Sequence, residues 1–224
     1  MWRDALLVAG KDLRIEGRSR VALNQVLPFA ILVLVLFAFA LDPDRGVLVR
    51  AAAGLYWVAV LFSALLAVQR SQAVESGEGT RDALRLSGLD PAGVFLGKAA
   101  AVAVQLLVLE VLLGVGVTVL YSVEPAGLGL LVITALVATA GLAAAGTLYG
   151  VIAAGLRVRE TLLPLLLLPV LAPVLIAATR ASETALSGVS SGVPAGSWLV
   201  LLATFAVVYL GFGVVAFGPL LEDA

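Results

Sequence analysis

Side chains that commonly carry out catalysis are scarce in this sequence. Its 224 residues include no His and no Cys, and the single Met is Met1. Without His, a Ser-His-Asp triad and the commonest metal ligand are missing, and without Cys there is no thiolate site or disulfide. A phosphate-binding loop of the form G-x-x-x-x-G-K-[ST] is missing too, because Ala99 follows Gly97-Lys98. We therefore expect neither an enzyme nor a metal-binding protein.

The composition indicates an integral membrane protein. Apolar residues make up 62% of the chain and charged residues 13%, and the mean hydropathy is +1.12. Soluble domains are typically about 45–50% apolar and about 25% charged. In water this chain would expose large apolar patches. The composition therefore excludes a soluble enzyme, a disordered tail and a disulfide scaffold.

Six apolar stretches are long enough to cross a membrane as helices, which takes about 20 residues each. They lie near residues 21–41, 51–68, 99–121, 127–156, 161–178 and 197–221. None shows the period of two that is typical of a membrane β-barrel. We predict an all-α integral membrane protein in which residues 21–224 form a single transmembrane domain.

Basic residues predict the orientation of these spans, because cytoplasmic loops are enriched in Lys and Arg. Eleven Lys and Arg residues lie in three segments: before the first span, between the second and third spans, and between the fourth and fifth spans. The connections on the other side hold only Arg45, Arg50 and Arg180. This asymmetry predicts that both termini are cytoplasmic.

Two segments outside the spans are predicted to form helices. Residues 1–20 place apolar side chains on one helical face and charged ones opposite, as in amphipathic helices on membrane surfaces. The alternative is a simple basic anchor for the first span. Between spans two and three, Thr80 and Gly88 are good helix caps around residues 81–87. They predict a short cytoplasmic helix that docks on a partner, and the alternative is a plain connecting turn.

Two spans contain residues that are unusual in a membrane. Glu110 lies near the middle of the third span, where a charge is costly and usually faces a bundle interior or a cavity. It is a candidate polar wall of a substrate path or a partner contact. The alternative is a protonated Glu that bonds the backbone or Gln105. The fifth span contains Pro164, Pro169 and Pro173, which favour the helix bends that moving transporters use, although prolines are also common in spans.

The fourth span contains Gly146-x-x-x-Gly150, a small-residue face that favours tight helix packing. Its packing partner is another span of this chain, a second copy or another subunit.

Three stretches of the sequence carry a family pattern. The most specific stretch runs from Gly54 to Lys98 and includes Glu75 and the run Gly79-Thr80-x-Asp82-x-Leu84. The others are the Pro-rich fifth span at residues 162–178 and a C-terminal stretch that ends in Phe217-x-Pro219-Leu220-Leu221-Glu222. Together these stretches resemble the CcmB family of membrane permeases, and the resemblance covers most of the chain.

Some positions depart from the family pattern. Arg81 replaces the usual Leu, Gly88 replaces a frequent Pro, and Ala206 stands where relatives often carry an acidic residue. Glu110 is not matched to the family pattern.

The resemblance implies a permease subunit of an ABC-type heme-handling complex for cytochrome c biogenesis, in the bacterial cytoplasmic (inner) membrane. The implied partners are a CcmA-like ATPase that binds ATP and Mg²⁺, CcmC-like and CcmD-like membrane subunits and a CcmE-like heme chaperone, together with membrane lipid and without nucleic acid. Heme is the expected substrate of the complex, and no cofactor is expected on this chain. The ATPase is expected to dock at the following residues: Glu75, Gly79, Thr80, Asp82, Leu84 and Arg85.

Two other functions stay open at the level of sequence. One is an ABC-2-type permease for a lipid, a drug or a polysaccharide, and the other is a membrane scaffold that transports nothing. ATPase association separates a permease from a scaffold, and heme spectra or cytochrome c assays separate the two substrates. Because Tyr is the only remaining common iron ligand, we expect the isolated chain to bind heme weakly or not at all.

Overall fold

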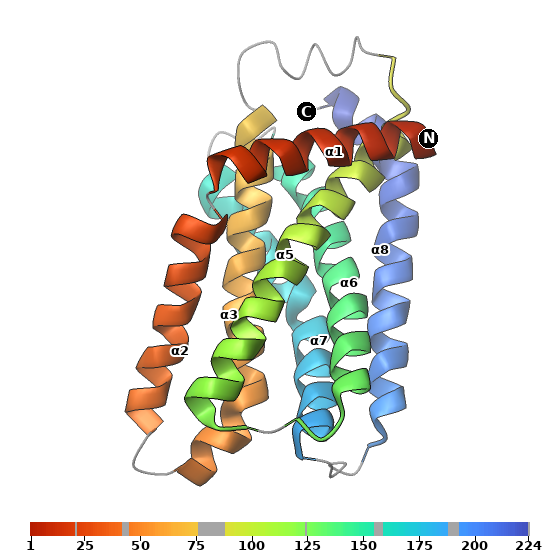
Figure 1. The fold of residues 1–224 in the computed structure, drawn as a ribbon. Coiled ribbons are helices and arrows are strands. Elements are labelled where there is room, and N and C mark those ends of the chain that lie inside the picture. The colour runs from red at the N-terminus through yellow and green to blue at the C-terminus, as the bar shows by residue number, and fades with distance from the viewer. Residues whose placement is uncertain are drawn as a thin grey trace.

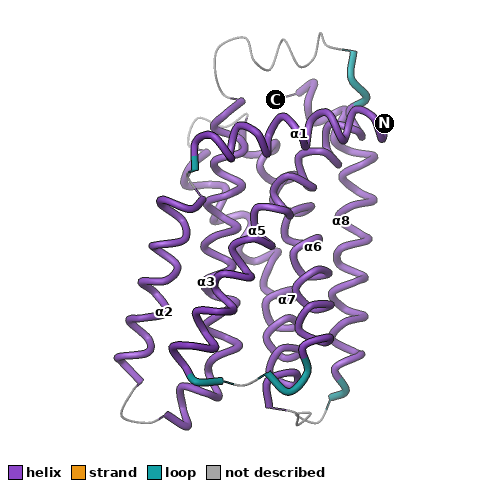
Figure 2. Tube along the Cα trace, viewed as in Figure 1, coloured by secondary structure: helices purple, strands orange, loops and turns teal. Residues whose placement is uncertain are grey.

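The computed structural model describes residues 1–20, 22–41, 45–75, 88–123, 125–154, 159–187 and 193–223. It begins with α1 (Trp2–Ser19), the π-helix η1 (Ala22–Val26), α2 (Leu27–Leu41) and α3 (Arg45–Glu75). The later elements are α5 (Pro91–Tyr121), α6 (Leu128–Ala154), α7 (Arg159–Ser187) and α8 (Ala195–Asp223). The described residues contain helices and no strand (Figure 2), which confirms the all-α prediction for this part of the chain.

Six candidate membrane spans are present among the described residues, as predicted, but three of them are clearly longer than predicted. The second runs over Gly46–Ala73 rather than residues 51–68. The fifth span continues to Leu186, beyond the predicted end at residue 178. The third begins at Pro91 rather than at residue 99, because Asp90 caps α5 by accepting a hydrogen bond of 3.1 Å from the Ala92 N–H. Lys98, predicted to lie in a loop, is therefore inside α5.

The six long helices run up and down in one bundle, and α1 lies across one end of it (Figure 1). We call this end the α1 end. Both termini lie there, as do the end of α3 and the beginning of α5. The helices α5 and α7 end at the opposite end of the bundle.

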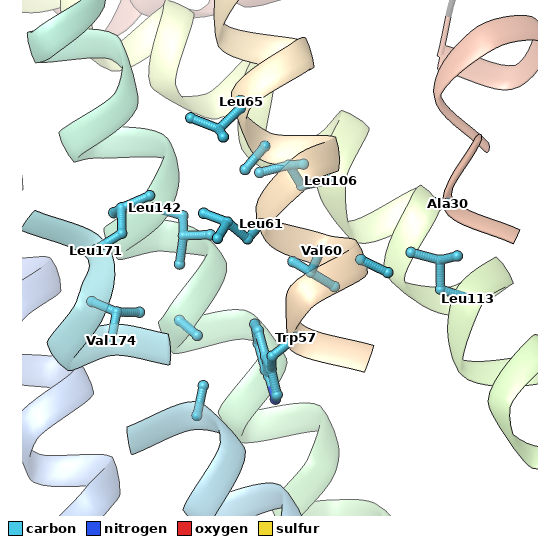
Figure 3. Packing of buried hydrophobic residues seen from close by; sticks show 14 of the residues in the cluster. Ala30, Trp57, Val60, Leu61, Leu65, Leu106, Leu113, Leu142, Leu171 and Val174 are labelled. Carbon is cyan, nitrogen blue, oxygen red and sulfur yellow. The ribbon is translucent and has the colours of Figure 1, made fainter. Parts of the chain in front are cut away.

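The core lies between α3, α5, α6 and α7 (Figure 3). Its large buried side chains include Trp57, Leu61, Leu106, Leu142 and Leu171. Trp57 is anchored at the α7 side, because its indole Nε1 donates a hydrogen bond of 2.9 Å to the Ser182 hydroxyl. The predicted end of the fifth span at residue 178 would leave Ser182 in the following loop, but Ser182 is buried in α7 because that helix is longer than predicted.

The Gly146–Gly150 face of α6 packs against α3 of the same chain. A Cβ atom at Gly146 would lie 2.5 Å from Cγ2 of Val68, and one at Gly150 would lie 2.7 Å from Nε2 of Gln72. Only glycine leaves room for α3 at these distances. The predicted tight packing is confirmed, and its partner is another span of this chain.

Candidate functional site

The helix α1 packs directly on the first turns of α5, because two glycines of α5 leave room for its backbone. A Cβ atom at Gly93 would lie 2.6 Å from the Met1 carbonyl oxygen, and one at Gly97 would lie 2.6 Å from the Ala5 carbonyl oxygen. Ala5 and Val8 form the buried face of α1. We call this contact the α1–α5 seam.

The face of α1 away from the seam carries large apolar side chains. Trp2 is 70% exposed and Leu6 is 76% exposed. These side chains are available to a membrane surface or a partner. The location of α1 on the membrane surface stays a prediction.

A buried ion pair lies at the seam. Lys98 is 1% exposed, and its Nζ lies 3.8 Å from Oδ2 of Asp12 on α1. The other carboxylate oxygen of Asp12 lies 3.0 Å from Nζ of Lys11. This pair links α1 to α5. Separating the two helices would be costly, because it would leave the Lys98 charge buried without its partner. Sequence analysis missed it, although Asp90-Pro91 is a helix-start signal that places Lys98 two turns into α5.

A cavity of about 310 Å³ that has polar side chains in part of its wall lies near the α1 end. We call it the Arg70 cavity. Its polar lining comes from η1 and α3, and comprises Gln25, Gln69, Arg70 and Gln72. The Nε atom of Arg70 is buried and has no hydrogen-bond partner. The Gln72 side chain packs against Gly150, because a Cβ atom at Gly150 would collide with the Gln72 amide.

An apolar hollow of about 520 Å³ lies toward the opposite end, with walls from α3, α5, α6 and α7. Glu110 lines it and is 3% exposed. The Thr139 hydroxyl donates a hydrogen bond to Oε1 of Glu110, and Oε2 has no hydrogen-bond partner. The Tyr56 hydroxyl donates to the Glu110 backbone carbonyl at 3.3 Å. The structure thus gives the Glu110 side chain a partner on α6 in place of the predicted backbone or Gln105.

Most residues of the predicted ATPase-docking site lie outside the described residues. These are Gly79, Thr80, Asp82, Leu84 and Arg85. Glu75 is the last residue of α3, at the α1 end (Figure 1). The docking site stays a prediction.

The predicted helix-bending residues Pro164, Pro169 and Pro173 all lie inside α7, which is one helix from Arg159 to Ser187. Pro169 and Pro173 are exposed, whereas Leu167 and Leu171 of the same helix are buried. The last two prolines therefore face away from the core. A bend at these residues stays a prediction.

Comparison with known proteins identifies the family. The family described as CcmB protein matches residues 3–222. Heme exporter protein B of Haemophilus influenzae is 32% identical over 202 residues, which cover 90% of each chain. Heme exporter protein B of Paracoccus denitrificans is 33% identical over 187 residues, covering 82% of this chain and 84% of the relative. The corresponding Pseudomonas aeruginosa protein is 27% identical over 210 residues, or 94% of each chain. With a family match over nearly its whole length, this chain belongs to the CcmB family.

Proposed function

We propose that this chain is the transmembrane permease subunit of an ABC-type heme-handling complex for cytochrome c biogenesis in the bacterial cytoplasmic membrane. The family match over residues 3–222 carries this proposal, because similar proteins are named heme exporter protein B. Six candidate spans support a multi-pass membrane protein. The relatives do not favour an ABC-2-type permease for a lipid, drug or polysaccharide.

The α1 end is the proposed receiver of ATP-driven motion. A CcmA-like ATPase would bind ATP and Mg²⁺ and dock between α3 and α5, where the sequence carries Glu75 and Leu84. The seam and the Asp12–Lys98 pair support this role because they fasten α1 to the beginning of α5. α5 then continues to the wall of the apolar hollow at Glu110. A packed helix is a rigid element that can couple the two ends of the bundle.

Heme transfer or release of the heme-loaded chaperone is the proposed output. CcmC-like and CcmD-like subunits would complete the membrane complex, and a CcmE-like chaperone would carry the heme. This division of labour fits a chain without His or Cys, because iron ligands would come from partner subunits.

ATPase docking is tested by copurification from cells that express the whole complex. The double variant Leu84→Asp, Arg85→Glu should lose the ATPase, because it removes an apolar contact and reverses a charge at the proposed site. The matched control is Arg50→Glu, a charge reversal at the opposite end of the bundle, which should retain the ATPase. Undiminished copurification of the double variant at normal expression would contradict docking at this loop. The heme assignment is tested separately by heme staining of c-type cytochromes. Cells without this chain should lack the stained cytochromes, and expression of the wild-type chain should restore them.

A further inference from the structure

We propose that the Arg70 cavity binds the oxyanion end of an amphipathic ligand, a carboxylate or a phosphate attached to an apolar body. One source of such an anion, the carboxylates of a porphyrin, rests on the proposed function. The other source, the headgroup of an anionic lipid, does not.

Hydrogen-bonding side chains are concentrated in this cavity. The chain has four Gln residues, and three of them line the Arg70 cavity. Amide N–H groups and a guanidinium together provide many donors, and a guanidinium pairs with carboxylate or phosphate through two parallel hydrogen bonds. A polar atom buried in an apolar bundle is costly unless a ligand or water satisfies it, and the Nε of Arg70 is such an atom. The unsatisfied Arg70 donor, with amide groups beside it, therefore indicates a site for an acceptor-rich group.

The Arg70 side chain has a hydrogen-bond donor that no acceptor of the described residues satisfies. Its Nε is buried without a hydrogen-bond partner, although Arg70 also lines a narrow hollow beside Asp12 and Glu16 of α1. Asp12 already pairs with Lys11 and Lys98. An oxyanion in the cavity would supply an acceptor to a guanidinium donor that the protein leaves unsatisfied.

The cavity lies at the depth where two candidate spans begin or end. Gln25 lies near the beginning of the candidate span Asn24–Leu41, and Arg70 lies near the end of the span Gly46–Ala73. Charged lipid headgroups begin at the ends of such spans. Gln25 is also supplied by η1, and π-helical segments occur frequently at functional sites.

The remaining walls indicate how the rest of the ligand is accommodated. Val26, Leu66 and Leu163 line the same cavity and provide apolar surface next to the polar groups. A volume of about 310 Å³ is near the lower limit of ligand pockets, which range over about 300–1,000 Å³. The cavity therefore holds the charged end of a ligand, and its apolar body extends along the helices.

The experiment uses the purified chain in phosphatidylcholine nanodiscs and two probes. The first probe is metal-free mesoporphyrin with free carboxylates, compared with its dimethyl ester by fluorescence, with empty nanodiscs as the partitioning background. The second is phosphatidylglycerol, included in the nanodiscs and counted on the released protein by native mass spectrometry. The variant Arg70→Gln should weaken binding about tenfold, the loss expected for one charge-assisted hydrogen bond.

Two further variants separate binding from folding. Arg70→Lys keeps the charge but loses the planar fork, so its affinity should lie between those of the wild type and Arg70→Gln. Arg180→Gln removes an Arg at the opposite end of the bundle and should bind as the wild type. Melting temperatures in detergent show whether each variant is folded.

The outcomes distinguish the two anion sources. Saturable binding of the diacid but not the diester, dependent on Arg70, supports the proposal with a carboxylate ligand. Retention of phosphatidylglycerol that depends on Arg70, without porphyrin binding, supports it with a lipid headgroup. Equal binding of diacid and diester without lipid retention, or equal behaviour of Arg70→Gln and Arg180→Gln, overturns it. ATPase copurification of Arg70→Gln should match the wild type, so failure here is distinguishable from failure of the proposed function.

Discussion

The tyrosines are the only common iron ligands, apart from Met1, that this chain offers to heme. In the structure their side chains are engaged in packing or hydrogen bonds. The Tyr121 hydroxyl donates to the Leu34 carbonyl at 3.0 Å, and the Tyr56 hydroxyl donates to the Glu110 carbonyl. The rings of Tyr149 and Tyr209 pack with centroids 6.4 Å apart. Iron ligation would have to disrupt such contacts.

We therefore predict that heme added to the isolated chain binds weakly and without a protein axial ligand. The measurement is a heme titration in detergent, followed by the Soret absorption. Replacing each tyrosine by Phe should leave the spectrum unchanged, because no hydroxyl reaches the iron. A saturable stoichiometric complex with a defined axial-ligand spectrum, lost in one Tyr→Phe variant, would contradict this prediction.

Some residues of the candidate site can be predicted from the sequence alone, and others cannot. Glu110 is conspicuous because it is a charge inside a long apolar stretch. Its hydrogen-bond partner Thr139 is not conspicuous, because Thr residues are common in membrane spans. The contact also requires α5 to pack on α6, which the sequence of either span does not indicate. Gln69, Arg70 and Gln72 are polar residues after the predicted end of a span, so they resemble a loop. Only the longer α3 and the neighbouring η1 bring them together around a cavity.

The α1–α5 seam is the element contact that sequence patterns describe least well. The pattern of α1 indicates an apolar face and a charged face. The structure turns Ala5 and Val8 toward Gly93 and Gly97, and brings Asp12 to Lys98. The sequence around Gly93 and Gly97 does not indicate that they pack against α1, because these glycines only leave space for the α1 backbone. Helix existence follows from local periodicity, whereas this contact depends on residues far apart in the chain.

We predict that filling the seam detaches α1 from α5. In the chain, which has no native Cys, a Val8→Cys probe should react slowly with a maleimide because Val8 is 4% exposed. Adding Gly97→Leu should accelerate this labelling, because the α1 backbone at Ala5 occupies the space that the side chain needs. Gly114→Leu is the control in the same helix, since a Cβ there meets nothing within 4 Å. Equal labelling rates in both backgrounds would contradict a close seam.

At the scale of the whole molecule, the six alternating spans bring both termini to the α1 end (Figure 1). Six spans follow from hydropathy alone, because each is a long apolar segment. Hydropathy does not predict how the spans surround two hollows, because a hollow is lined by side chains from several helices, as the four helices around the apolar hollow show. The Arg70 cavity and the apolar hollow lie toward different ends of the bundle, and residues such as Leu61 and Leu106 pack in the core. The two hollows would therefore face different sides of a membrane.

The last prediction assigns these ends to the two sides of the membrane. Basic residues predict that the α1 end is cytoplasmic. Single Cys residues at Ser122 and Ser187, which follow or end helices at the opposite end, should then react with an impermeant maleimide added to intact spheroplasts. Gly10→Cys on α1 should react only after the membrane is opened. Labelling of Ser122→Cys and Ser187→Cys from the cytoplasm alone would reverse the orientation. Labelling of Gly10→Cys and Ser122→Cys from the same side would contradict the bundle itself, because the structure places these residues at different ends.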